Sequence, residues 1–210
     1  MTSEIQYYLS AGIDTWDQKS PIVVLMHGYG SNEEDLTDLM GYLPGNLAWV
    51  SLQAPLALSF GSYAWFPLAA PGVPKAEHVL EATAAIWNWI DLNLPAEAPI
   101  IALGFSQGGL MATQLLRSRP ERIAGTVILS GFTLAEPQPL DEQIANDRPR
   151  VIYTRGLNDQ VITPATVERT TGWLQAHTDA TICTYEGLGH SIDQRVLDDV
   201  SKYLLEILPS

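Results

Sequence analysis

The stretch Gly104-Phe105-Ser106-Gln107-Gly108-Gly109 has the pattern G-x-S-x-G and lies between two segments with different periodicities. Residues 100–103 form a short apolar run of the size of a buried strand. Residues 110–120 carry apolar side chains at helical spacing and end in a proline. A serine in a sharp turn from strand to helix exposes its hydroxyl, and the glycines give the turn steric room. This context favours a nucleophilic serine over a plain Gly-Ser turn.

Composition limits the classes of function. The chain has 210 residues, which suits one α/β domain over residues 1–210, and 46% of them are hydrophobic. Lysine and arginine number 11 against 24 aspartate and glutamate, so the net charge is −13. Such a surface repels phosphate backbones and anionic lipids. We therefore expect neither a nucleic-acid partner nor a stable association with a membrane.

The single cysteine, Cys183, excludes an internal disulfide and a cysteine-based metal cluster. It lies in the apolar run 181–185, where a small core residue is the usual interpretation. The first residues lack the basic and apolar regions of a signal peptide, and no apolar run has membrane-spanning length. We expect a cytoplasmic protein that needs neither a metal nor an organic cofactor.

Apolar segments of strand length alternate along the chain with helical patterns, which predicts a mostly parallel sheet with helices on both faces. The predicted strands are residues 21–26, 48–52, 99–103, 123–129, 150–154 and 181–185. Residues 4–10 could add an antiparallel edge strand. Residues 133–148 are rich in Pro, Asp and Glu and are too short for a helical cap over the sheet.

Several helices have recognisable ends. A stripe of apolar side chains over residues 79–90 is closed by Pro95. Three other helices are predicted to begin at capping residues, namely Ser31 with Glu34, Ser191 with Gln194, and Thr163 before Pro164.

A serine nucleophile needs a positioned base, and reacting groups gather at the carboxyl ends of parallel strands. His78 and His177 lie within helical patterns, where a solvated or helix-end histidine is the usual interpretation. His27 directly follows a predicted strand but precedes the serine. His190 lies in the glycine-rich loop 186–190 after the last strand. We expect His190 to be the base, with a turn or capping histidine as the alternative.

The acid that orients the base should lie between serine and histidine in chain order. Asp141 and Asp147 belong to the loose segment, where turn or surface roles fit them, and Asp179 precedes its strand. Asp159 follows the carboxyl end of the strand at 150–154, on the same edge as the serine. We expect Asp159 to be the acid, although a plain turn aspartate would have the same position.

Acyl transfer also requires hydrogen-bond donors for the developing oxyanion. In this architecture they are the backbone amide after the nucleophile, here Gln107, and an amide from a loop after an early strand. In His27-Gly28-Tyr29-Gly30 the two glycines would let the Tyr29 amide turn toward the site. His27 would then shape this loop and would not be the base.

The chain resembles a small bacterial member of the phospholipase/carboxylesterase family of α/β-hydrolases, which includes the acyl-protein thioesterases. The matching blocks are residues 25–31, 52–55, 63–66, 104–109, 156–159 with Val161, and 189–190. The resemblance implies an α/β-hydrolase fold without a large cap domain. It also implies a catalytic triad of Ser106, Asp159 and His190, with oxyanion amides from Tyr29 and Gln107.

Two positions depart from the family pattern. Arg155 stands where many relatives carry histidine, and Thr163 replaces a small apolar residue. Neither position is catalytic in the family, so the implied triad is unaffected, but the rim of the site could differ.

The resemblance implies a serine carboxylesterase for short to medium acyl esters, with thioesters or lysophospholipids as further substrates. In the aromatic segment 56–73, Tyr63, Trp65 and Phe66 would line an acyl groove. The alternative is that these aromatic side chains fill the edge of the sheet. Rival functions are a peptidase or lactonase with the same triad, or a non-catalytic binding protein of the same fold. The sequence leaves monomer and dimer open.

Overall fold

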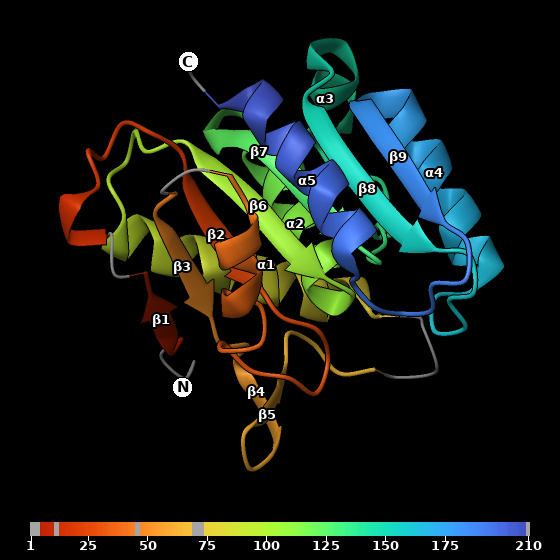
Figure 1. Cartoon of the computed structure of the whole chain (residues 1–210), viewed down its shortest axis with the longest axis horizontal. Coiled ribbons are helices and arrows are strands. Elements are labelled where there is room, and N and C mark those ends of the chain that lie inside the picture. The colour runs from red at the N-terminus through yellow and green to blue at the C-terminus, as the bar shows by residue number, and fades with distance from the viewer. Residues whose placement is uncertain (1–4, 11–12, 45–46, 69–73, 209–210) are drawn as a thin grey trace.

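In the computed structural model, which describes residues 5–10, 13–44, 47–68 and 74–208, seven strands form one mostly parallel sheet (Figure 1). The strands are β1 Tyr7–Leu9, β2 Ile22–Met26, β3 Trp49–Leu52, β6 Ile100–Phe105, β7 Ile123–Leu129, β8 Arg150–Gly156 and β9 Asp179–Tyr185. Their order across the sheet is β1-β3-β2-β6-β7-β8-β9. β1 pairs antiparallel to β3 and the other pairs are parallel. The predicted edge strand is thereby confirmed, except that residue 4 lies outside the described residues.

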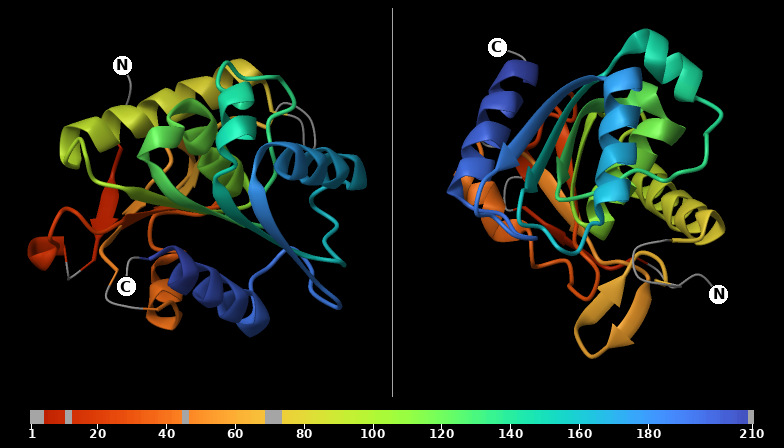
Figure 2. Two further views of the ribbon diagram at one scale, coloured as in Figure 1. Left: turned by 90° about the horizontal axis from the view of Figure 1, so that it is seen from above. Right: turned by 90° about the vertical axis from the view of Figure 1, so that its right-hand side faces the viewer.

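Helices cover both faces of the sheet (Figure 2). One face carries α1 Ala76–Asn93, α2 Gln107–Ser118, α3 Asp141–Asp147 and α4 Pro164–His177, and the other carries α5 Gln194–Ile207 and the 3₁₀ helix η2 Thr37–Tyr42. All five residues of β2 are buried, because a central strand of a parallel sheet is covered on both sides. Among the described residues no large cap domain covers the sheet, as expected.

The predicted helix beginnings had different outcomes. At α4 the prediction is confirmed, because the Thr163 side chain accepts a hydrogen bond from the Thr166 amide. At α5 the capping residue is Asp193 and not Ser191, since the Asp193 carboxylate accepts hydrogen bonds from the amides of Arg195 and Val196. A carboxylate at this position also interacts favourably with the positive end of the helix dipole.

The capping box predicted at Ser31 is wrong. Ser31 forms an isolated antiparallel bridge with Tyr63, so its backbone is engaged in pairing and does not begin a helix. The Asn32 side chain instead accepts a hydrogen bond from the Glu34 amide in a local turn. The residues that follow form only a short 3₁₀ helix, η2, over Thr37–Tyr42.

A two-stranded hairpin occupies part of the aromatic segment 56–73. β4 Leu56–Ser59 pairs antiparallel to β5 Ser62–Ala64. Figures 1 and 2 show the hairpin projecting from the end of the sheet at which the parallel strands have their carboxyl ends. Residues 69–73 of the predicted segment lie outside the described residues.

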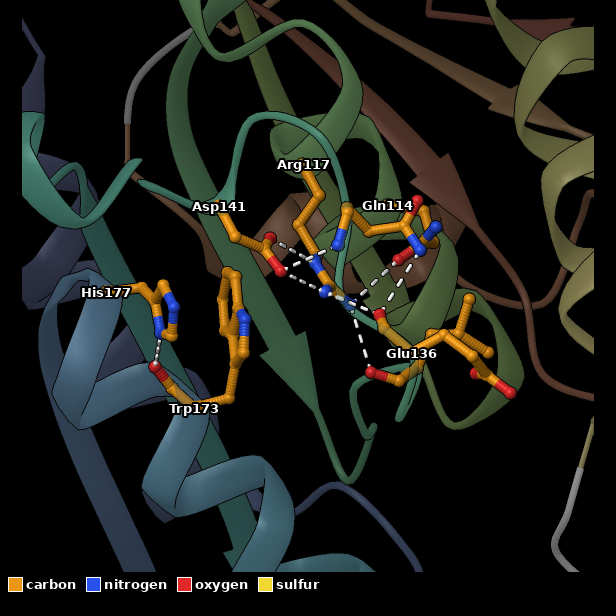
Figure 3. Close-up of polar contacts among 8 residues, drawn as sticks. Gln114, Arg117, Glu136, Asp141, Trp173 and His177 are labelled. Carbon is orange, nitrogen blue, oxygen red and sulfur yellow. Dashed lines mark hydrogen bonds and ion pairs between the residues drawn. The ribbon is translucent and has the colours of Figure 1, made fainter. Parts of the chain in front are cut away.

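The segment 133–148 contains the short helix α3 and is held by a buried ion pair (Figure 3). The Arg117 side chain is 1% exposed and donates two hydrogen bonds to the Asp141 carboxylate, at 2.8 and 2.6 Å. It also donates to the carbonyl oxygens of Leu134 and Glu136 and lies over the ring of Trp173. Asp141 therefore holds this segment in place and is not the turn or surface residue that the sequence predicted.

Asp141→Asn should lower the free energy of unfolding by about 3 kcal/mol, because it leaves the Arg117 charge buried without a counter-charge. Burial raises the pKa of the Asp141 carboxyl, but the Arg117 and Gln138 hydrogen bonds outweigh it and the pKa is lowered. A lowered carboxyl pKa stabilises the fold at neutral pH, and this contribution is lost as pH falls through that pKa. Urea unfolding at neutral and acid pH measures both effects.

Asp91→Asn is the matched control, since Asp91 pairs with Arg119 on the surface, where both side chains are about 40% exposed. It should cost less than about 1 kcal/mol. Equal losses in the two variants would show that the Arg117–Asp141 pair contributes no more than an exposed one.

Candidate active site

The turn at Ser106 has the geometry of a nucleophile elbow. Ser106 has φ 54° and ψ −113°, a conformation that non-glycine residues rarely adopt. Its amide donates to the carbonyl oxygen of Leu129 in the neighbouring strand, at 2.8 Å. Side chains at Gly104 and Gly108 would collide with backbone, with the Gly108 carbonyl in the first case and the Met26 carbonyl in the second. The turn therefore requires glycine at both positions, as the sequence predicted.

The structure brings together the three side chains that the sequence singled out. His190 Nε2 lies 2.8 Å from Ser106 Oγ, and His190 Nδ1 lies 2.7 Å from Asp159 Oδ2. The three residues follow β6, β8 and β9, at the carboxyl ends of parallel strands in one sheet, where β7 lies between β6 and β8. The Asp159 side chain is fully buried, so its charge is shielded from solvent. The His190 side chain is 16% exposed, so the imidazole remains accessible to solvent.

Backbone contacts hold the Asp159 and His190 loops against each other. The amide of Asn158 donates to the carbonyl oxygen of Leu188 at 2.9 Å. A side chain at Gly156 would collide with the same carbonyl. The second carboxylate oxygen of Asp159, Oδ1, accepts hydrogen bonds from two amides of its own loop. The orientation of the carboxylate is therefore fixed independently of the histidine.

His27 occupies a different position from the base. It is fully buried, and burial lowers its pKa. Nδ1 lies 2.7 Å from the carbonyl oxygen of Gly28, and Nε2 lies 3.0 Å from the amide nitrogen of Ala54. A carbonyl only accepts and an amide N–H only donates, so the ring is neutral with its proton on Nδ1. His27 thus shapes the loop that follows β2, as the sequence predicted.

The predicted oxyanion donors belong to two different elements that meet at the serine. Tyr29 belongs to the loop after β2, and Gln107 is the first residue of α2. A Cβ atom on Gly28 would lie 3.6 Å from Ser106 Cβ, so this loop packs directly on the elbow. The amides of Tyr29 and Gln107 stay the predicted donors, since two N–H groups beside a nucleophilic serine suit an anionic oxygen.

The three aromatic residues predicted to line an acyl groove differ in exposure. Trp65 is 2% exposed and Phe66 is 1% exposed, and both belong to the main core cluster. Tyr63 is only partly buried and packs against that cluster. These values favour the alternative that Trp65 and Phe66 fill the edge of the sheet. Contact of an acyl chain with Tyr63 stays a prediction.

Three hydrogen bonds of this region have no signal in the sequence. The Gln107 side chain bonds to the backbone of residues 65 and 66, and the Trp65 indole bonds to the backbone of His27.

Among the described residues no group of three or more His, Cys, Asp or Glu side chains is placed to hold a metal ion. No described helix is both long and apolar enough to cross a membrane.

Comparisons with known proteins agree with this architecture. Acyl-protein thioesterase 1 of Candida albicans is 25% identical over 215 residues, which cover 89% of this chain and 91% of that protein. The carboxylesterase of Bacillus cereus superposes with a TM-score of 0.82 at 20% identity, covering 98% of this chain and 95% of that one. The carboxylesterase of Mesorhizobium loti gives a TM-score of 0.81 at 19% identity, covering 98% and 97% of the two chains.

The family model described as phospholipase/carboxylesterase matches residues 13–208, almost the whole chain. The structural neighbours show the same fold, with a mostly parallel sheet and helices on both faces. The chain therefore belongs to the phospholipase/carboxylesterase family of α/β-hydrolases.

Proposed function

We propose that this chain hydrolyses carboxylic esters of short to medium acyl chains through an acyl-enzyme formed on Ser106. The observation that supports the proposal best is the continuous series of hydrogen-bonding distances from Asp159 through His190 to the Ser106 hydroxyl. A serine hydroxyl is a weak nucleophile at neutral pH, and a base within hydrogen-bonding distance activates it.

In the proposed reaction Ser106 Oγ attacks the ester carbonyl while His190 Nε2 takes its proton. The tetrahedral oxyanion accepts hydrogen bonds from the amides of Tyr29 and Gln107. Collapse of this intermediate breaks the bond to the alcohol, which receives the proton from His190. A water molecule then attacks the acyl-enzyme in the same way, releasing the carboxylic acid and restoring Ser106. Asp159 keeps the His190 proton on Nδ1 throughout.

Thioesters and lysophospholipids are cleaved by the same steps and are further candidate substrates. The similarity to a protein named acyl-protein thioesterase supports a direct comparison of oxygen and sulfur leaving groups. A peptidase or lactonase activity would use the same triad, but no feature of the described residues favours either.

A fluorophosphonate probe tests the proposal, because it reacts covalently with an activated serine. We expect labelling of the native protein at Ser106, identified by peptide mass spectrometry, and no labelling of Ser106→Ala. Absence of labelling in the folded native protein would contradict the proposal and favour a non-catalytic binding protein.

The enzyme should hydrolyse p-nitrophenyl esters from acetate to octanoate and should turn over long-chain triglycerides poorly. The insertion after β7 contains only the seven-residue helix α3, which is too short for a lid of several helices. We therefore expect no jump in rate when a short-chain ester exceeds its solubility and forms a separate phase. A lipase-like jump at that concentration, measured by titration of released acid, would show that a segment closes over the site.

A further inference from the structure

Residues 62–66, which we call the bracket, contact both sides of the candidate oxyanion hole. On one side the bracket pairs with the loop after β2, which carries Tyr29. The Gly30 amide donates to the Tyr63 carbonyl oxygen, and the Tyr63 amide donates to the Ser31 carbonyl oxygen, both at 2.8 Å. These two bonds fix the loop just after Tyr29 to the bracket.

On the other side the bracket is held by the side chain of Gln107, whose own backbone amide is the second candidate donor. Gln107 Oε1 accepts a hydrogen bond from the Trp65 amide, and Nε2 donates to the Phe66 carbonyl oxygen, both at 2.8 Å. Gln107 is 2% exposed. Because both polar ends of a buried side chain have backbone partners in one short segment, the start of α2 is fixed to the bracket.

A third contact joins the bracket to the beginning of the loop after β2. Trp65 Nε1 donates to the His27 carbonyl oxygen at 2.9 Å, and the indole is 2% exposed. A Cβ atom on Gly108 would lie 2.7 Å from that same oxygen, so the first turn of α2 packs against the peptide that Trp65 holds. The Trp65 indole therefore lies where the loop after β2 meets α2.

An oxyanion hole made from two elements works only if both N–H groups stay at hydrogen-bonding distance from one oxygen atom. A shift of either element by a fraction of an ångström would lengthen one of the two bonds in the transition state. We propose that Trp65 and the Gln107 side chain are positioning residues that set the separation of the Tyr29 and Gln107 amides. The proposal rests on the esterase function proposed above and assigns Trp65 a role other than contact with the acyl chain.

Trp65→Phe tests the proposal by removing one hydrogen-bond donor and part of a ring. We expect kcat for ester hydrolysis to fall about tenfold with KM within about twofold of the native value, because the contact matters most when the oxyanion is present. Affinity for an alkyl trifluoromethyl ketone, which forms an oxyanion on the serine, should fall by a similar factor. Trp87→Phe is the matched control, since Trp87 is 4% exposed and its Nε1 donates to Ser118 Oγ at 2.8 Å.

Gln107→Met is a second, independent variant, with Gln114→Met as its control. Gln114 is 1% exposed and lies in the same helix. Thermal midpoints should fall in variants and controls alike, whereas kcat and ketone affinity should fall only in Trp65→Phe and Gln107→Met. The proposal is overturned if kcat is unchanged in both of these variants, or if the controls lose as much. If the native protein is not labelled by the fluorophosphonate probe, the proposed esterase function itself is wrong. If the native protein is labelled and active, an unchanged kcat in Trp65→Phe and Gln107→Met contradicts only the role proposed for the bracket.

Discussion

Ser106→Ala and His190→Ala should each lower kcat for ester hydrolysis by a factor on the order of 10⁴ or more. The first change removes the atom that would form the acyl-enzyme. The second removes the base that lies 2.8 Å from that atom. Steady-state kinetics with p-nitrophenyl butyrate measures both losses, with the circular dichroism spectrum and thermal midpoint as a check that each variant remains folded.

The double variant, with both Ser106→Ala and His190→Ala, tests whether the two side chains act as one unit. When two residues act in one proton transfer, removing either of them abolishes nearly all of the rate enhancement that they provide together. The kcat of the double variant should therefore be scarcely lower than that of the single variants. Losses that multiply would show that the two side chains act separately and would contradict the triad. His78→Ala, in α1, serves as a control for the loss of a histidine and should stay within a few-fold of the native rate.

The strands and the positions around Ser106 could be predicted because their signals are local. Continuous apolar runs mark strands that are covered on both faces, and the glycines of the elbow mark close backbone approaches. The order of serine, acid and base along the chain then left few candidates, and the structure places Asp159 and His190 within hydrogen-bonding distance of each other.

The features that sequence reasoning missed depend on contacts between distant residues. The hairpin that includes Tyr63 pairs with the loop around Ser31, which removed Ser31 from its predicted helix. Gln107 is 41 residues from the carbonyl that it binds, and Arg117 is 24 residues from Asp141. No periodicity or spacing in the sequence predicts such pairs, because the two partners come within hydrogen-bonding distance only once the chain has folded.

The Asp159 carboxylate has a hydrogen-bond pattern that an amide cannot reproduce. Oδ1 accepts hydrogen bonds from the amides of Val161 and Ile162, at 2.8 and 3.1 Å, and Oδ2 accepts one from His190 Nδ1. An asparagine has one oxygen, and the two fixed amides would take it. Its NH₂ group would then face His190 Nδ1 and donate to it, so the imidazole proton would move to Nε2.

Asp159→Asn should therefore keep the fold and lower kcat by a factor on the order of 10⁴, because a proton on Nε2 prevents His190 from accepting the proton of Ser106. The measurement is kcat at neutral pH, together with the circular dichroism spectrum and thermal midpoint of the variant. Asp179→Asn, at the start of β9, and Asp147→Asn, at the end of α3, are the matched controls and should stay within a few-fold of the native rate. If Asp147→Asn were the crippling change and Asp159→Asn were mild, the orienting acid would lie in the insertion after β7. The tautomer argument predicts the opposite ranking, because only Asp159 has one oxygen committed to backbone amides and the other to the base.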